Sequence, residues 1–85
     1  MSQLDSILTK ILSGLSDANI GFDDLVYVLE HYGFERRTKG SHNIFRKKGI
    51  YERINLQKDG NKAKPYQVKQ VRKILIDNQL VKYDV

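Results

Sequence analysis

The chain has 85 residues, of which 40% are apolar and 29% are charged, and its formal net charge is +5. This length supports one modest hydrophobic core and excludes a deep substrate cavity, and the absence of cysteine excludes disulfides and thiolate zinc sites. Two histidines without cysteine predict no metal site, and the lack of a basic leader and of any apolar run near about 18 residues predicts a cytoplasmic protein without a membrane span.

Charge is distributed unevenly along the sequence. Residues 1–32 carry one lysine against five carboxylates, a balance of −4, whereas residues 33–85 carry fourteen Lys and Arg against five carboxylates, a balance of +9. Segregated positive charge with interleaved Phe and Tyr is typical of a surface that binds a phosphate-bearing polymer. A solubilising surface is the simpler interpretation, but solubility does not require segregation, so we favour binding to nucleic acid.

The first predicted element is a helix over residues 4–15. Its apolar residues recur at helical spacing and form one stripe, which consists of Leu4, Ile7, Leu8, Ile11, Leu12 and Leu15. Such a stripe needs a partner surface, which is either the protein's own core or another chain, including a second copy in a homodimer. We therefore treat residues 1–20 as an N-terminal helical extension within a single domain of residues 1–85.

A second helix is predicted over residues 22–32, and Gly33 ends it. Acidic residues in its first turn favour the helix. Its apolar stripe consists of Phe22, Leu25, Val26, Leu29 and Tyr32. His31 lies on the opposite flank, so we interpret it as an exposed surface histidine.

Three strand-length runs follow, at residues 34–39, 42–47 and 51–57. They are rich in Phe, Ile, Tyr, Arg and Thr, and tight glycine turns at residues 39–41 and 48–50 separate them. This pattern predicts an antiparallel meander.

The faces of these strands are only partly predictable. In the third run Ile54 and Leu56 share one face, which would pack on helices. In the second run the alternation is ambiguous, because Ile44 and Phe45 fall on opposite faces. The burial of His42 therefore stays open.

The last predicted helix begins at Pro65, after a turn-forming loop at residues 58–62, and ends near Asn78. Its buried stripe consists of Val68, Val71, Ile74 and Leu75, and its outer side of Lys69, Arg72 and Lys73. The order is α-α-β-β-β-α, an α+β class. Without the first helix this is the order of the double-stranded-RNA-binding domain, in which both helices pack on one face of a three-stranded antiparallel sheet.

The most basic segment contains the tripeptide Gly40-Ser41-His42 among six cations. RNA can be cleaved without a metal ion, because its 2′-hydroxyl can attack the adjacent phosphorus if groups are present to move protons and to hold the developing charge. Histidine suits the proton transfers, and Lys and Arg suit the phosphate. Gly40 lets the backbone approach a phosphate, and the Ser41 hydroxyl can donate to one. A lone histidine at a strand start is more often structural, so both a catalytic site and a binding surface stay open.

Three segments resemble the HicA family of toxin–antitoxin toxins: Gly33-Phe34, Lys39-Gly40-Ser41-His42-Asn43-Ile44-Phe45-Arg46, and Arg72-Lys73-Ile74-Leu75 before Asn78-Gln79-Leu80. The resemblance spans about residues 22–80. It implies a fold like the double-stranded-RNA-binding domain and a small, basic, metal-independent mRNA endoribonuclease without a cofactor. It also implies that His42 is catalytic and that a HicB-like antitoxin neutralises the protein.

The chain departs from this family pattern at three places. Many members have a second histidine where this chain has Asn43, and many have Pro-x-His where it has Asn55-Leu56-Gln57. The helix over residues 4–15 is an addition. Without a second histidine the proton partner of His42 is open between Tyr51, Lys39 and water, and the alternative function is a non-catalytic RNA-binding module of the same fold.

The leading hypothesis is thus mRNA cleavage with His42 as general base or acid. The residues expected to hold RNA are Arg36, Arg37, Lys39, Gly40, Ser41, Arg46, Lys47, Lys69, Arg72 and Lys73. The antitoxin is expected to be acidic, or to carry an acidic patch, and to cover His42 and the surrounding cations.

Overall fold

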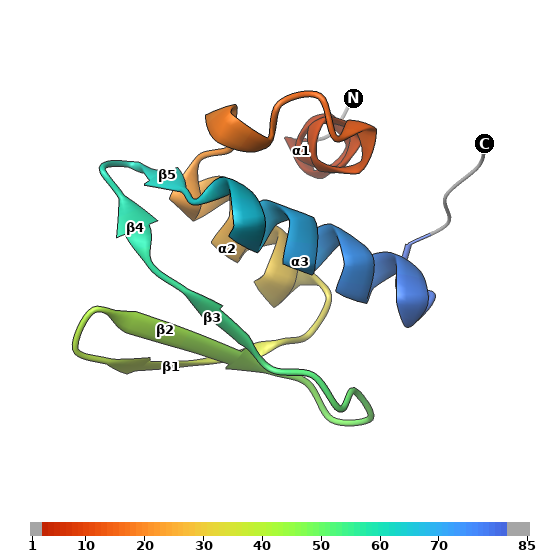
Figure 1. Ribbon diagram of the computed structural model, residues 1–85. Coiled ribbons are helices and arrows are strands. Elements are labelled where there is room, and N and C mark those ends of the chain that lie inside the picture. The colour runs from red at the N-terminus through yellow and green to blue at the C-terminus, as the bar shows by residue number, and fades with distance from the viewer. Residues whose placement is uncertain (1–2, 82–85) are drawn as a thin grey trace.

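A three-stranded antiparallel sheet forms one side of the molecule, and three helices lie on the other (Figure 1). The computed structural model describes residues 3–81. The helices are α1 (Gln3–Ser13), α2 (Phe22–His31) and α3 (Pro65–Asp77), with a short 3-10 turn, η1 (Asp17–Asn19), between the first two. The predicted α+β class and order of the main elements are confirmed.

The sheet has the order β1-β2-β3, formed by β1 (Glu35–Lys39), β2 (His42–Arg46) and β3 (Ile54–Leu56). A two-residue turn joins the first two strands, and its Gly40 has a φ of 61°, a left-handed conformation that favours glycine in such hairpins. The third strand is shorter than the predicted run of residues 51–57, because only Ile54–Leu56 pairs with β2.

A second, two-stranded hairpin lies where the sequence predicted only a loop. It consists of β4 (Lys58–Asp59) and β5 (Lys62–Ala63), so the flanks of the expected turn pair with each other. The hairpin is tied to the segment before α2, because Phe22 N donates to Asn61 O at 3.0 Å and Ala63 N donates to Ile20 O at 2.9 Å. These long-range bonds explain why local sequence signals did not reveal it.

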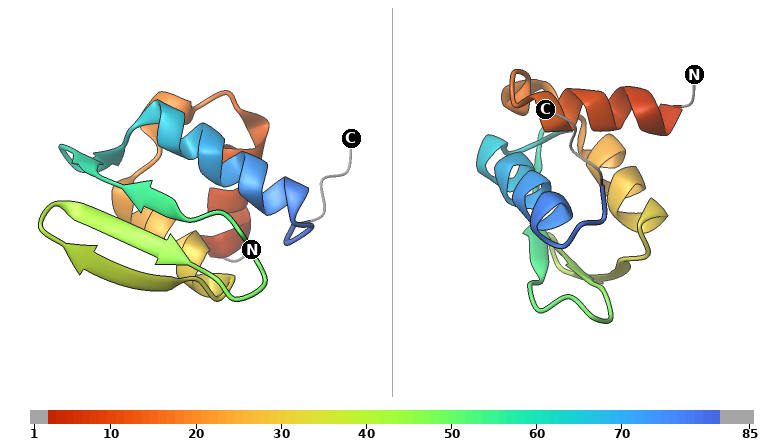
Figure 2. Two further views of the ribbon diagram at one scale, coloured as in Figure 1. Left: turned by 60° about the horizontal axis from the view of Figure 1, so that its bottom comes forward. Right: turned by 90° about the vertical axis from the view of Figure 1, so that its right-hand side faces the viewer.

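Helices α2 and α3 lie side by side between the sheet and α1 (Figure 2). The predicted stripe of α3 is buried, and Pro65 begins the helix as expected. On the sheet, Phe45, Ile54 and Leu56 are completely buried toward these helices. This resolves the ambiguity in β2: Phe45 faces the core, and Ile44 faces the other side.

Helix α1 belongs to the domain's own core. Ile7 and Ile11 are buried, and full burial of such a side chain stabilises by about 1.5–3 kcal/mol. The predicted stripe ends early: the helix stops at Ser13, Gly14 takes a φ of 72°, and Leu15 is 89% exposed. No helix within residues 3–81 is long and apolar enough to cross a membrane.

Candidate functional site

The sheet presents one face away from the helices, and His42 lies on it at the start of β2. Directly opposite residues of antiparallel strands share a face, and the register pairs His42 with Lys39, Ile44 with Arg37, and Arg46 with Glu35. We call this the outer face, which consists of Glu35, Arg37, Lys39, His42, Ile44, Arg46 and Asn55. All of these side chains are exposed except Ile44, which is partly buried.

The structure does not bring Arg36 to His42. Arg36 pairs with Phe45 and so lies on the face turned toward the helices. Its Nε and one terminal nitrogen donate to Oδ1 of Asn43 at 3.2 and 2.8 Å, and Thr38 Oγ1 donates to the same oxygen at 3.2 Å. Asn43 is itself buried, and its Nδ2 donates to Leu56 O at 3.3 Å. Position 43 therefore contributes to the inner side of the sheet and does not lie beside His42 on the outer face.

The imidazole of His42 lies against two amides from β3 and the residue after it. Asn55 has Nδ2 at 3.1 Å and Oδ1 at 3.3 Å from Nδ1 of the ring, so the amide is placed to donate or to accept. The Gln57 Nε2 lies 3.2 Å from Nδ1 and 3.4 Å from Nε2. Lys64 Nζ donates to Gln57 Oε1 at 3.2 Å, which turns the Gln57 amide nitrogen toward the ring. These contacts hold an exposed imidazole in one place.

A hollow of about 350 Å³ opens beside this ring, between β3 and the first turns of α3. Its lining consists of His42, Arg53, Asn55, Gln57, Tyr66, Gln67 and Gln70. Gln67 is 1% exposed and joins the two walls. In the amide orientation that satisfies both atoms, it donates to Gln57 O at 3.3 Å and accepts from Gln57 N at 3.1 Å. We call this space the histidine hollow.

A second hollow, of about 380 Å³, lies on the outer face and is rich in arginine. Its lining consists of Glu35, Arg36, Arg37, Ile44, Arg46 and Arg53. Arg53 lines both hollows and thus connects them. The outer side of the sheet therefore presents Arg37, Lys39, Arg46 and Arg53 against one carboxylate, Glu35, which favours an anionic ligand.

The remaining predicted residues lie further from the ring. Ser41, next to Gly40 in the hairpin turn, borders a third hollow of about 300 Å³ with Asn43, Gln57 and Lys58. The Lys47 ammonium lies beside Gly33, at the other end of β2. Lys69 and Lys73 are exposed on α3. Lys73 donates to Asp77 at 2.7 Å, and this hydrogen bond, with the carboxylate's charge, raises the pKa of Lys73.

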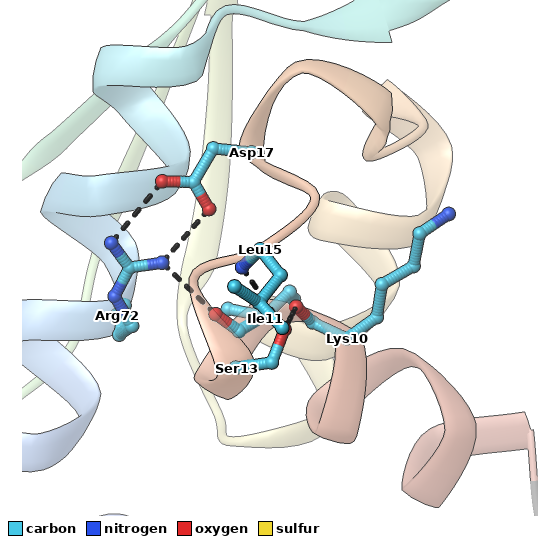
Figure 3. Close-up of polar contacts among 6 residues, drawn as sticks. All are labelled: Lys10, Ile11, Ser13, Leu15, Asp17 and Arg72. Atoms are coloured by element: carbon cyan, nitrogen blue, oxygen red, sulfur yellow. Dashed lines mark hydrogen bonds and ion pairs between the residues drawn. The ribbon is translucent and has the colours of Figure 1, made fainter.

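Arg72 is not on the outer side of α3, contrary to expectation (Figure 3). Its guanidinium donates to both carboxylate oxygens of Asp17, at 2.9 and 3.2 Å, and to Ile11 O at 3.0 Å. The side chains of Arg72 and Asp17 are only 19% and 17% exposed. Arg72 thus joins α3 to the end of α1 and to η1, and the fork geometry of arginine suits this bidentate contact.

Several residues of the histidine hollow escaped prediction. Arg53 directly precedes Ile54, whose face was expected to pack on helices, so strand alternation could have put Arg53 on the opposite face and added it to the site. Tyr66, Gln67 and Gln70 come from α3, and only the packing of α3 on β3 brings them to His42. By contrast, the predicted exposure of His31 is confirmed; it lies on α2, with its ring edge-on to Tyr32 at 5.1 Å. Among residues 3–81, no three His, Cys, Asp or Glu side chains cluster where a metal ion could bind.

Comparison with known proteins gives one family match. The model of a family described as the HicA toxin of bacterial toxin–antitoxin systems matches residues 22–76, which is more than half of the chain. The matched segment contains His42, the residues that line all three hollows, and most of α3. Searches of curated proteins and of solved structures each found no match.

Proposed function

The chain belongs to the HicA toxin family, and from this membership we propose that it is an mRNA endoribonuclease, the toxin of a toxin–antitoxin pair, with His42 as its proton-transferring residue. The observation that carries the proposal is the position of His42. Its imidazole is exposed on a cationic sheet face, at the rim of a hollow, and two amides orient it. An extended RNA strand fits such a shallow site.

The reaction needs only groups that this chain supplies. When Asn55 Oδ1 accepts from Nδ1–H of the neutral imidazole, Nε2 carries the lone pair, and the RNA 2′-hydroxyl can give its proton to Nε2 by replacing the 3.4 Å contact from the Gln57 amide nitrogen. The 2′-oxygen then bonds to phosphorus, and the bond from phosphorus to the 5′-oxygen breaks. The leaving oxygen takes a proton, so the products are a 2′,3′-cyclic phosphate and a 5′-hydroxyl.

Cations around His42 would stabilise the charge that develops on the phosphate. Lys39 lies directly across the hairpin from His42, so we assign it this role and the donation of a proton to the leaving oxygen, directly or through water. Tyr51 is less suited, because it is 96% exposed and does not line the histidine hollow. Arg53 connects the two hollows, so phosphates on either side of the cut would lie near Arg53 and near Arg37 and Arg46.

The other predicted cations would act at a distance from the cut. Lys69 and Lys73 would extend the cationic surface along α3. Gly40 and Ser41, at the tip of the β1–β2 hairpin, would contact a phosphate there. Arg72 contributes to the fold through Asp17 rather than to this cationic surface. Arg36 borders the second, arginine-rich hollow of the outer face, while its guanidinium donates hydrogen bonds to Asn43 Oδ1.

The decisive experiment uses purified protein and an unstructured RNA in excess chelator. We expect cleavage by the wild-type protein, none by His42→Ala, and unchanged cleavage by His31→Ala, since His31 is an exposed histidine on the other side of the molecule. Equal cleavage by the wild type and His42→Ala would refute the assignment. Strict dependence on added magnesium would refute the metal-independent mechanism.

The second candidate is a non-catalytic RNA-binding module. It draws support from the groups around His42, which are amides and cations rather than a second histidine or a carboxylate. This candidate predicts salt-sensitive RNA binding and no cleavage at any pH. The same assay, run over a pH series, separates the two candidates. Histidine catalysis gives a cleavage rate that depends on pH, whereas a binding module gives no cleavage at any pH.

Family membership also implies a HicB-type antitoxin. We propose that it carries an acidic surface and covers His42 with the outer-face cations, where Ile44 adds an apolar centre. A complex that dissociates in high salt supports a mainly ionic interface. A homodimer through α1 has less support, because Ile7 and Ile11 of α1 are buried in the protein's own core and Leu15, the one exposed residue of the predicted stripe, lies beyond the end of the helix. Sedimentation of the purified chain measures its oligomeric state.

A further inference from the structure

The histidine hollow has two walls of different chemistry, one formed by the sheet and the other by α3. The sheet side contributes His42, Arg53 and two amides and adjoins the outer-face cations, whereas α3 contributes Tyr66, Gln67 and Gln70. The lining contains neither a carboxylate nor an aliphatic side chain. A phosphate would bind preferentially on the sheet side, whereas the lining from α3 suits a ligand of different chemistry.

Tyr66 is the aromatic group of this wall. It lies in the first turn of α3, directly after Pro65, and 62% of its surface is exposed. Its ring is thus available at the hollow, while the neighbouring Gln67 is buried and fixes that turn of the helix against Gln57. An exposed ring on a rigid helical turn is suited to stacking against a flat partner.

The polar groups around Tyr66 are amides from three positions, Asn55, Gln57 and Gln70. A side-chain amide has two N–H donors and two acceptor lone pairs, so Asn55 and Gln57 keep further hydrogen-bonding capacity beside their contacts to His42 and Lys64. A donor next to an acceptor is also the combination that the edge of a nucleobase presents. The volume, about 350 Å³, is at the small end of the range for ligand pockets, which suits one base rather than a larger group.

We propose that the α3 side of the histidine hollow is a subsite for one unpaired nucleobase of the RNA, with Tyr66 as its stacking platform and with Gln57 and Gln70 as the amides that contact its edge. This inference rests on the proposed function, since it names the substrate as single-stranded RNA and places the base next to the phosphate that His42 serves. Tyr66 is a positioning and specificity residue. A paired base is excluded from the subsite because its edge and both its faces are already occupied.

The test separates binding from cleavage by using a 2′-O-methyl oligouridine, which cannot be cut through a 2′-hydroxyl. Fluorescence anisotropy measures its affinity for the wild type, Tyr66→Ala, Tyr66→Phe and Tyr51→Ala, the last being a tyrosine that is even more exposed but lies outside the hollow. We expect Tyr66→Ala to weaken binding about ten- to a hundredfold, as the loss of one base stack implies. Tyr66→Phe and Tyr51→Ala should bind as the wild type does.

Two further probes identify the ligand as an unpaired base. An abasic 2′-O-methyl strand of the same length should bind the wild type and Tyr66→Ala equally, and a fully paired 2′-O-methyl duplex should bind more weakly than the single strand. Equal oligouridine affinities for the wild type and Tyr66→Ala, or a loss in Tyr66→Phe as large as in Tyr66→Ala, would overturn the stacking role. Tighter binding of the duplex would overturn the unpaired base. These results do not depend on cleavage, so failure of the nuclease assay is a separate outcome.

Discussion

The contact between Arg72 and Asp17 should be a main support of α1, and replacing Arg72 by methionine tests this. Methionine keeps an unbranched apolar stem but removes three hydrogen bonds, two of them to a carboxylate that is only 17% exposed. A hydrogen bond to a charged group contributes about 1.5–3 kcal/mol when it is buried. Because water still reaches about a fifth of each side chain, we expect the free energy of unfolding to fall by about 2 kcal/mol in total.

Urea unfolding followed by circular dichroism measures this loss. With a denaturant slope of about 1–2 kcal/mol per molar, the midpoint should fall by about 1–2 M at an unchanged slope. Lys73→Met is the matched control, since Lys73 is the adjacent residue on α3 and its pair with Asp77 is solvent-exposed. Its midpoint should not move.

A double-mutant cycle with Asp17→Asn assigns the loss to the contact itself. The double variant should be more stable than the sum of the single losses predicts, with a coupling of about 1 kcal/mol or more, because the two side chains share their hydrogen bonds. A coupling near zero would refute this explanation. It would mean that Ile7 and Ile11 hold α1 without help from the ion pair.

Two other predictions concern the site and the pH dependence of stability. Asn55→Asp should retain cleavage, since it keeps an acceptor for Nδ1–H of His42, whereas Asn55→Leu should slow single-turnover cleavage by at least about tenfold; equal rates would contradict the orienting role. Burial, and next the charge of Asp5, raise the pKa of Tyr32 above its ordinary 10.0 in the folded protein. The neutral phenol's contribution is therefore complete below about pH 10 and is lost as the pH rises through the folded pKa, so the urea midpoint should fall more steeply above about pH 10 in the wild type than in Tyr32→Phe. Urea midpoints that change with pH in parallel in the wild type and Tyr32→Phe would contradict this contribution of Tyr32.

Periodicity predicted the helices and the sheet well because each has an apolar face that local spacing reveals. It failed where two apolar neighbours compete, as at Ile44 and Phe45, since only packing against α2 and α3 decides which one is buried. It also failed at Arg72, which lies at the margin of the apolar stripe of α3. Its partner Asp17 is 55 residues away in the chain, a distance over which spacing carries no information.

The candidate site was predictable to the same extent. His42 could be found because it stands in the most basic segment, and the hairpin register then placed Lys39 and Arg37 beside it. The same alternation removed Arg36, since neighbouring residues of a strand point to opposite faces. The α3 wall could not be found from local sequence, because Tyr66 meets His42 only through the packing of α3 on β3.

The joining of β3 to α3 through Gln67 has a consequence for the order of synthesis. The ribosome makes α3 after the whole sheet, so a nascent chain that has reached β3 already contains His42 but lacks Tyr66 and the buried amide that fixes Gln57. It also lacks the apolar stripe of α3, without which the sheet has no complete core to pack on. A fragment that ends before α3 therefore carries the histidine without the wall of the hollow beside it, so the candidate site is assembled only once the last helix has been made.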